Sequence, residues 1–195
     1  DVLSVFAGLR PLAAPRSEGK KTKEISRSHK LIREKSGLIT IIGGKWTTYR
    51  KMAQDTLDLA IRYMHIPTKD CITERYQIHG SRKNPDFSDP LYVYGTDADE
   101  IRNLVASSPA MAEKLHPDYA YTVGEVTWLV RNEMPRTLED VLARRLRILF
   151  LDARAAMAMA PKVAGILATE WGKDETWTSA QVKAFNEVAS NYILN

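Results

Sequence analysis

The order of hydrophobic and polar positions divides the chain into a mixed first part and a helical second part. Residues 2–12 predict a strand, and the segments Glu24–Arg33 and Leu38–Ile42 predict two more. The short polar stretch at residues 34–37 would join the last two strands as a β-hairpin. The first part of the chain is therefore expected to contain a small amount of β-structure.

A single amphipathic helix is predicted directly after Gly44. Thr47 or Thr48 is the expected N-cap, and Pro67 is expected to end the helix. Its apolar face has helical spacing. The residues of this face are Met52, Leu59 and Tyr63, widened by Ala53, Leu57, Ala60 and Ile61.

From Asp97 onward the periodicity is helical throughout. Capping residues, including a capping box, mark several of the expected helix starts. The predicted starts are Asp97 or Asp99, Thr122, Thr137 with its capping-box partner Asp140, and Thr178 or Ser179. Between them we expect one helix through Leu149–Ala158 and a second that begins at Pro161 and closes at Trp171 and Gly172.

These elements predict a mainly α fold, in which an all-helical bundle at residues 97–195 follows a small β-hairpin and strand remnant. Residues 67–96 are rich in Pro, Gly, Asp and Ser, and structureless stretches of this length are uncommon inside a compact unit. We therefore predict a first domain at 1–66, a linker at 67–96 and a helical domain at 97–195. Because the chain begins at Asp1 inside a predicted strand, we expect it to be a fragment of a longer protein.

Composition and charge limit the kinds of molecule that this chain is expected to bind. The 195 residues are 44% hydrophobic and 27% charged, as in ordinary globular proteins. Residues 1–60 hold 12 Lys and Arg against six Asp and Glu, which favours an anionic partner: a phosphate-bearing small molecule, a nucleic acid or a membrane surface. The single cysteine, Cys71, excludes an intrachain disulfide and a cysteine-built zinc site, and favours a reducing, cytoplasmic location.

The candidate site is the junction Gly43-Gly44-Lys45, where an apolar run passes into a helix. Glycines let the backbone approach a ligand closely, and the following helix start supplies free amides and a positive dipole end. Two interpretations stay open on spacing alone: an ordinary tight turn, or a site for a phosphate, a carboxylate or an anionic ring. Arg10 and Arg27 are two further cations near predicted strand ends, and each is equally compatible with a solvated surface charge.

Other candidate chemistry is weaker. The four histidines have no mutual ligand spacing, so no metal site is predicted. The basic run at 144–147 is read as a helix end whose charges complement the dipole, with contact to anionic lipid or to a partner domain as the alternative. Residues 16–35 are basic but contain no aromatic residue, which argues against a nucleic-acid partner.

Several motifs in a fixed order carry a resemblance to a known family. SVFAGLRPL, ISRSHKL, GLITIIGGKWTTYRKMA and TLEDVLARR follow one another along nearly the whole chain. Together they resemble the C-terminal part of FAD-dependent, aerobic-type glycerol-3-phosphate dehydrogenases. In that family the N-terminal portion carries the FAD site with its GxGxxG turn, and no GxGxxG occurs in this sequence. The resemblance therefore implies a piece that lacks the N-terminal FAD domain.

The resemblance also implies roles for the candidate residues. Arg10 and Arg27 would contact the substrate, sn-glycerol 3-phosphate, through its phosphate, and Lys45 would lie between substrate and flavin. The backbone of Gly43, Gly44, Lys45, Trp46 and Thr47 would face the pyrimidine edge of FAD. The family's base, a histidine, would lie upstream of Asp1, so no catalytic residue is assigned in this chain and His29 is not given that role.

The implied reaction is hydride transfer from the substrate to FAD, which gives dihydroxyacetone phosphate, with electrons passing to a quinone. The fragment alone is expected to be inactive, and exposed sheet edges would favour a homodimer. The location implied is cytoplasmic, with peripheral contact to the inner face of the cytoplasmic membrane. Trp46 and Leu146 depart from the family pattern, which usually has Leu and Thr there. The alternatives are an oxygen-using glycerol-3-phosphate oxidase and a helical module for protein or membrane interaction.

Overall fold

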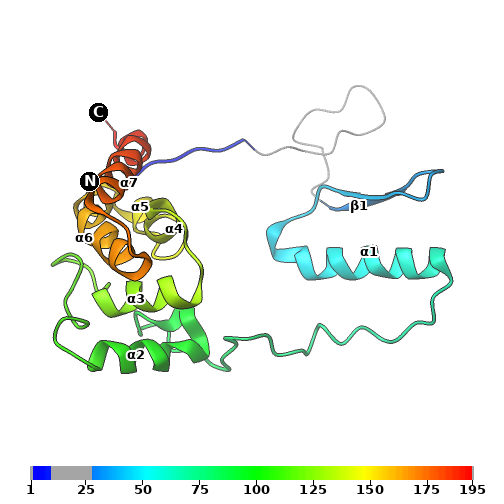
Figure 1. The fold of residues 1–195 in the computed structure, drawn as a ribbon. Coiled ribbons are helices and arrows are strands. Elements are labelled where there is room, and N and C mark those ends of the chain that lie inside the picture. Colours follow the sequence, from blue (N-terminus) through cyan, green and yellow to red (C-terminus); the bar gives the residue numbers. More distant parts are fainter. Residues whose placement is uncertain (1, 10–27, 195) are drawn as a thin grey trace. The chain divides into compact units, whose positions relative to one another are not determined.

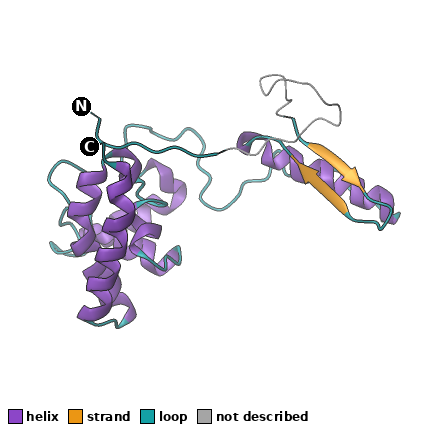
Figure 2. Ribbon diagram, turned by 90° about the horizontal axis from the view of Figure 1, so that it is seen from above, coloured by secondary structure: helices purple, strands orange, loops and turns teal. Residues whose placement is uncertain are grey.

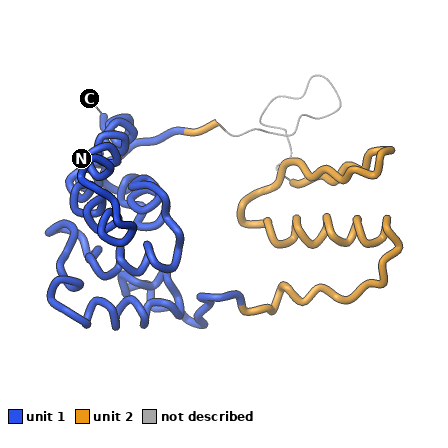
Figure 3. Tube along the Cα trace, viewed as in Figure 1, with its two compact units in different colours: residues 1–7, 78–195 blue, residues 8–77 orange. Residues whose placement is uncertain are grey.

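The computed structural model describes residues 2–9 and 28–194, which form two compact units (Figure 3). The smaller unit spans residues 8–77, and the larger unit combines residues 1–7 with 78–195. Seven α-helices and one two-stranded sheet lie in the described residues, so the predicted mainly α fold is confirmed. The domain limits predicted at residues 66 and 97 stay a prediction, because compactness alone does not define a folding unit.

The smaller unit is a β-hairpin beside one long helix (Figures 1 and 2). Strands β1 (Lys30–Arg33) and β2 (Ile39–Ile42) are antiparallel, with Leu31 opposite Ile41 and Arg33 opposite Ile39. The predicted hairpin is therefore confirmed, with β1 beginning at Lys30, while residues 24–27 of the predicted first strand lie outside the described residues. A 3-10 turn, η2 (Trp46–Thr48), leads into α1 (Tyr49–Met64), which ends before Pro67 as predicted.

Contacts between the hairpin and α1 hold the smaller unit together. The Arg33 guanidinium lies 4.3 Å from the centre of the Tyr63 ring of α1, so the face of the sheet that carries Arg33 is directed toward the helix. None of the described residues of this unit is fully buried. Hydrophobic burial therefore contributes less to its stability than to that of a complete domain of this length.

The backbone passes from β2 to η2 through a tight turn packed on α1. Gly44 adopts φ +89°, and a Cβ placed there would lie 2.5 Å from Met52 Sδ and 2.7 Å from Met52 Cε. Only glycine combines this backbone conformation with such a close approach at no cost. The turn is consequently fixed against the first half of α1.

The larger unit is a bundle of helices. Its elements are η3 (Tyr92–Asp97), α2 (Ala98–Ala106), α3 (Val123–Asn132), α4 (Leu138–Leu142), α5 (Ile148–Leu151), α6 (Ala153–Trp171), α7 (Glu175–Ala189) and η4 (Ser190–Tyr192). Helix α6 is the longest, and α3, α4, α5 and α7 all pack against it. No helix in the described residues has the length and hydrophobicity needed to span a bilayer.

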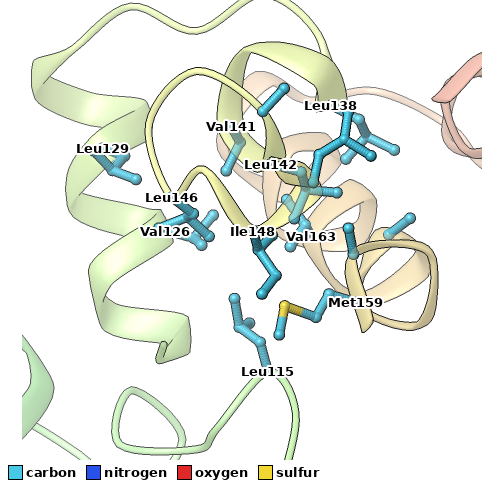
Figure 4. Packing of buried hydrophobic residues seen from close by; sticks show 14 of the residues in the cluster. Leu115, Val126, Leu129, Leu138, Val141, Leu142, Leu146, Ile148, Met159 and Val163 are labelled. Atoms are coloured by element: carbon cyan, nitrogen blue, oxygen red, sulfur yellow. The ribbon is translucent and has the colours of Figure 1, made fainter. Parts of the chain in front are cut away.

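The core of the larger unit is packed against the buried side of α6 (Figure 4). Met159 and Val163 of α6 are completely buried, and Figure 4 shows Met159 directed toward Leu115 and Ile148. Alanines make up most of the other buried positions of this helix, so neighbouring helices can approach its backbone closely. These alanines are Ala153, Ala155, Ala156, Ala160, Ala164 and Ala168.

Two of the predicted helix starts are confirmed by their caps. Thr122 Oγ1 accepts a hydrogen bond from the Glu125 amide at 3.2 Å and begins α3. Thr137 and Asp140 form the predicted capping box at the start of α4. Local sequence was sufficient here because a cap joins residues only three positions apart.

The prediction of two helices separated near residue 160 was wrong. Helix α6 runs without interruption through Pro161. It starts at Asp152, whose Oδ1 accepts from the Ala155 amide at 2.9 Å. Pro161 cannot donate to the carbonyl of Met157, a loss that the burial of Ala160 and its neighbours outweighs.

The predicted start of the last helix at Thr178 or Ser179 was also wrong. Asp174 caps α7 by accepting from the Trp177 amide at 2.8 Å, so the helix begins one turn earlier. Thr178 lies inside α7, where its hydroxyl donates to the Asp174 carbonyl at 3.1 Å. An aspartate is at least as good an N-cap as a threonine, and the sequence analysis did not consider Asp174.

The strand predicted at residues 2–12 is absent from its described part. Residues 2–9 form neither helix nor strand, and residues 10–12 lie outside the described residues. Among the described residues, Leu3, Ser4 and Val5 make hydrogen bonds to the ends of helices in the larger unit and none to a strand. A strand requires a paired neighbour, which the pattern of side chains alone does not supply.

One carboxylic acid is buried in the helical core. The side chain of Glu125 is only 4% exposed, and its Oε1 accepts a hydrogen bond from the Tyr94 hydroxyl at 2.6 Å. Burial raises the pKa of Glu125 to about 7, although the Tyr94 hydrogen bond acts in the opposite direction. The larger unit therefore contains a group that changes charge close to neutral pH.

Replacing this carboxyl should alter how stability depends on pH. Because the pKa of Glu125 is higher in the folded state, the protonated side chain favours folding below about pH 4.5. That contribution is lost as the pH rises to about 7, and the free energy of unfolding falls by about 3 kcal/mol in total. Glu125→Gln should therefore remove this decline. Urea unfolding measured through tryptophan fluorescence between pH 4.5 and 8 would check it.

Glu100→Gln is the matched control for this experiment. Glu100 Oε2 also accepts a hydrogen bond from an aromatic residue, Trp128, but its side chain is exposed. This variant should keep the pH dependence of the parent chain. Parallel stability curves for Glu125→Gln and the parent would contradict the assignment.

Substitution of Gly44 should loosen the smaller unit. Gly44→Ala places a methyl group against Met52 and imposes a left-handed conformation on alanine, at an expected cost of about 1–3 kcal/mol. Gly37→Ala is the control, since Gly37 has φ +92° but its Cβ would meet Tyr63 Oη at an ordinary 3.5 Å. Amide hydrogen exchange of α1 should accelerate more in Gly44→Ala. Equal acceleration in the two variants would show that contact with Met52 is unimportant.

Candidate functional site

The turn at residues 43–48 places two glycines and a lysine at the start of a helix. Gly43 and Gly44 have φ values of +76° and +89°, and Lys45 returns to an extended conformation. Thr48 closes the turn, because its hydroxyl donates to the Lys45 carbonyl at 3.0 Å and accepts from the Lys45 amide at 3.3 Å. The backbone of Lys45 is therefore held from two sides.

The predicted role of threonine at this helix start needs a correction. Thr48 occupies the N-cap position of α1, but its hydroxyl makes no capping bond to the amides of that helix. The hydroxyl is used instead to fix Lys45. The intervening 3-10 turn makes this possible, and a pattern of helical spacing does not reveal such a turn.

The side chains of this turn face solvent in the described structure. Lys45 and Thr47 are exposed, and Trp46 is 86% exposed, with its ring centre 5.8 Å from that of Tyr49. No described carboxylate lies within ion-pair distance of Lys45, and neither η2 nor α1 has an acidic residue in its first turn. The positive end of the helix and the lysine charge are thus not neutralised by described residues.

Of the predicted site residues, five lie together and two cannot be placed. Gly43, Gly44, Lys45, Trp46 and Thr47 form one continuous turn. Arg10 and Arg27 fall outside the described residues. Whether the three cations Arg10, Arg27 and Lys45 converge therefore stays a prediction.

A second polar group borders the turn and was missed by the sequence analysis. Asp55 of α1 binds His29 through Oδ2 at 3.0 Å and Lys51 through Oδ1 at 2.9 Å. The hydrogen bond from Lys51 lowers the pKa of Asp55, and His29 adds to this effect. This aspartate ties the segment that follows Arg27 to α1. The Lys51–Asp55 pair has i,i+4 spacing and could have been found, whereas the contact with His29 depends on the fold.

The histidines carry no metal site in the described structure. His29 and His79 each bond an aspartate, Asp55 and Asp97 respectively, as satisfied surface histidines do. No group of three or more metal-ligating side chains occurs among the described residues.

The basic run at 144–147 is used mainly within the larger unit. Arg144 pairs with Glu139 at 2.6 Å and with Asp140 at 2.9 Å. Arg145 donates to the carbonyl of Asp140 at 2.8 Å, at the end of α4. These contacts support the interpretation of a basic helix end that satisfies terminal carbonyls.

The arrangement at residues 43–47 suits an anionic or electron-rich ligand. The glycines remove side-chain bulk from one side of the turn, while the helix start and Lys45 supply positive charge. An exposed indole beside them offers a flat apolar surface. A ring system with carbonyl and nitrogen atoms along its edge would need hydrogen-bond donors and positive charge at that edge. The helix start and Lys45 supply both, so the described residues fit such a group.

Comparison with known proteins identifies the family. The model of the C-terminal domain of alpha-glycerophosphate oxidase matches residues 38–178. A probable mitochondrial glycerol-3-phosphate dehydrogenase of Caenorhabditis elegans is 35% identical over 99% of this chain and 29% of its own length. The mitochondrial glycerol-3-phosphate dehydrogenase SDP6 of Arabidopsis thaliana is 32% identical over 98% of the chain and 37% of its own length.

A third relative gives the same relationship. A probable mitochondrial glycerol-3-phosphate dehydrogenase of Dictyostelium discoideum is 34% identical over 98% of the chain and 33% of its own length. The chain thus spans about a third of the length of these relatives. Motifs, fold and comparisons agree, and the chain belongs to the family of the C-terminal domain of alpha-glycerophosphate oxidase, with glycerol-3-phosphate dehydrogenases as its homologues.

Proposed function

We propose that this chain is the C-terminal part of an enzyme that oxidises sn-glycerol 3-phosphate to dihydroxyacetone phosphate. The observation that carries the proposal is the two-glycine turn with an exposed lysine at a helix start, within a region that matches the family model. The chain contains no GxGxxG motif and corresponds to about a third of its relatives. By itself it should therefore be inactive.

The cofactor of the complete enzyme is proposed to be FAD, which would accept the hydride from C2 of the substrate. Gly43, Gly44, Lys45, Trp46 and Thr47 would hold the pyrimidine edge of the flavin. Positive charge fixed at that edge costs no rearrangement during the reaction, so it favours the state in which negative charge has developed. The two hydrogen bonds between the Thr48 hydroxyl and the Lys45 backbone would hold the turn from which this side chain extends.

The substrate is proposed to be held through its phosphate. Arg10 and Arg27 would supply guanidinium groups, which bind phosphate oxygens in a bidentate manner. Lys45 would lie between substrate and flavin as a point charge. The described residue His29, two positions after Arg27, is bonded to Asp55 of α1.

Electrons are proposed to leave the enzyme to a quinone, with peripheral contact at the inner face of the cytoplasmic membrane and a cytoplasmic location for the protein. A homodimer would cover exposed sheet edges. Oxygen is the second candidate acceptor, favoured by one observation: the matching family model takes its name from an oxidase.

Removal of the Lys45 charge should slow substrate oxidation in the full-length enzyme. Lys45→Ala should lower kcat/KM on the order of a hundredfold while the flavin stays bound, because one preorganised charge next to the reacting groups is lost. Lys35→Ala, an exposed lysine in the hairpin loop of the same unit, is the matched control and should be neutral. Steady-state kinetics with normal values for Lys45→Ala would refute the assignment.

The acceptor can be decided directly. A glycerol-3-phosphate dehydrogenase should reduce a soluble quinone analogue rapidly and release little peroxide in air, since its reduced flavin is protected from oxygen. Stoichiometric peroxide with slow quinone reduction would assign the chain to an oxidase.

Visible absorption of the full-length enzyme, recorded before and after addition of sn-glycerol 3-phosphate without oxygen, would test the substrate itself.

A further inference from the structure

His29 lies beside the two-glycine turn, at the open end of the hairpin. Strand β1 begins at Lys30, which pairs with Ile42, the last residue of β2. His29 and Gly43 are therefore the next residues of the two chains beyond the last pair. A Cβ placed at Gly44 would lie 3.4 Å from the Cβ of His29, so the histidine contacts the turn itself.

A hydrogen bond joins this histidine to α1. Nε2 of His29 donates to Oδ2 of Asp55 at 3.0 Å, since an ionised carboxylate only accepts. The other oxygen of Asp55 lies 2.9 Å from the ammonium of Lys51, one helical turn earlier. The side chains of His29 and Asp55 are 21% and 29% exposed, so water screens their bond less than it screens a fully exposed pair. Asp55 is thus fixed on α1 and holds His29 from there.

Met52 adds a packing contact at the same place. Met52 and Asp55 are three positions apart and lie on one face of α1. The Cβ at Gly44 that would approach His29 would also approach Met52 Sδ, at 2.5 Å. The turn, the residue before β1 and the first half of α1 therefore meet at one point, through packing at Met52 and a hydrogen bond at Asp55.

The bond between His29 and Asp55 closes a loop of chain that contains the whole turn. The two residues are 26 positions apart, and residues 43–48 lie between them. None of the described residues of this unit is fully buried, so packing alone constrains the turn only weakly. A ligand that contacts backbone groups binds more tightly when those groups are already ordered, because their ordering then costs nothing on binding.

We propose that His29 and Asp55 are positioning residues, which hold the turn at residues 43–47 in its ligand-binding conformation before the flavin arrives. The inference rests on the proposed function, since it takes this turn to hold the pyrimidine edge of FAD. Neither side chain is given a contact with flavin or substrate. Both act through the backbone of the turn, which His29 touches at Gly44.

The test uses the full-length enzyme with His29→Phe, whose ring fills similar space but cannot bond Asp55. In the flavin-free enzyme, hydrogen exchange of the backbone amides at residues 43–48 should accelerate. The dissociation constant for FAD, measured by fluorescence titration, should rise on the order of tenfold, because the turn then becomes ordered only on binding. His29→Gln keeps an N–H donor and should recover part of the affinity.

A double-mutant cycle tests whether the effect comes from the shared bond. Asp55→Ala should weaken FAD binding about as much as His29→Phe, and the double variant should bind FAD no more weakly than either single variant. Lys51→Ala removes only the second partner of Asp55 and should have a smaller effect. If His29→Phe does not fold, Asp55→Asn, which keeps the shape of the side chain and removes its charge, replaces it.

His79→Phe is the matched control. His79 also bonds an aspartate, with Nε2 2.8 Å from Oδ2 of Asp97, but it belongs to the larger unit. FAD affinity and amide exchange of the turn should stay as in the parent enzyme. The visible absorption of bound flavin is a second measurement: it should shift in His29→Phe, where the surroundings of the pyrimidine edge change, and not in His79→Phe.

The outcomes separate the positioning role from the proposed function. If amide exchange of the turn is unchanged in His29→Phe, the positioning role alone is overturned. If exchange accelerates but FAD affinity does not fall, the turn is not the flavin site, and the proposed function of residues 43–47 fails together with the positioning role. If the double variant binds FAD much more weakly than either single variant, or if His79→Phe has an equal effect, the shared bond is not responsible and the positioning role is overturned.

Discussion

The burial of helix α6 is the constraint on which the larger unit depends. Four other helices pack against it, and its many alanines allow them to come close to its backbone. The helix must therefore begin at a fixed place, and Asp152 sets that place through bonds to the Ala155 amide and the Tyr119 hydroxyl, both at 2.9 Å. The amide of Ala153, left unpaired by this start, is then available to the carbonyl of Leu3.

Different kinds of interaction fix the geometry of the two units. The larger unit has a core of fully buried side chains, so its geometry is set by packing. The described part of the smaller unit has no fully buried residue, so individual polar contacts contribute more to its geometry. These contacts are the hydrogen bonds between Thr48 and Lys45, the Arg33–Tyr63 contact, and the bonds of Asp55 to His29 and Lys51. A turn held in this way can present its backbone and a charged side chain to a ligand without a deep cavity.

The turn proposed as the ligand site belongs to the smaller unit. The smaller unit would present positive charge at residues 43–47, where glycines admit a flat ligand.

The sequence by itself determined the mainly α fold, the hairpin, the caps at Thr122 and Thr137 and the family, because these depend on short-range patterns and ordered motifs. Only the tertiary structure decided that α6 continues through Pro161, that Thr48 bonds to Lys45, and that residues 2–7 join the helical unit. The physical reason is common to the three cases. Each outcome is a competition between a local preference and a contact or burial that exists only after folding, and a pattern along the chain records the preference alone.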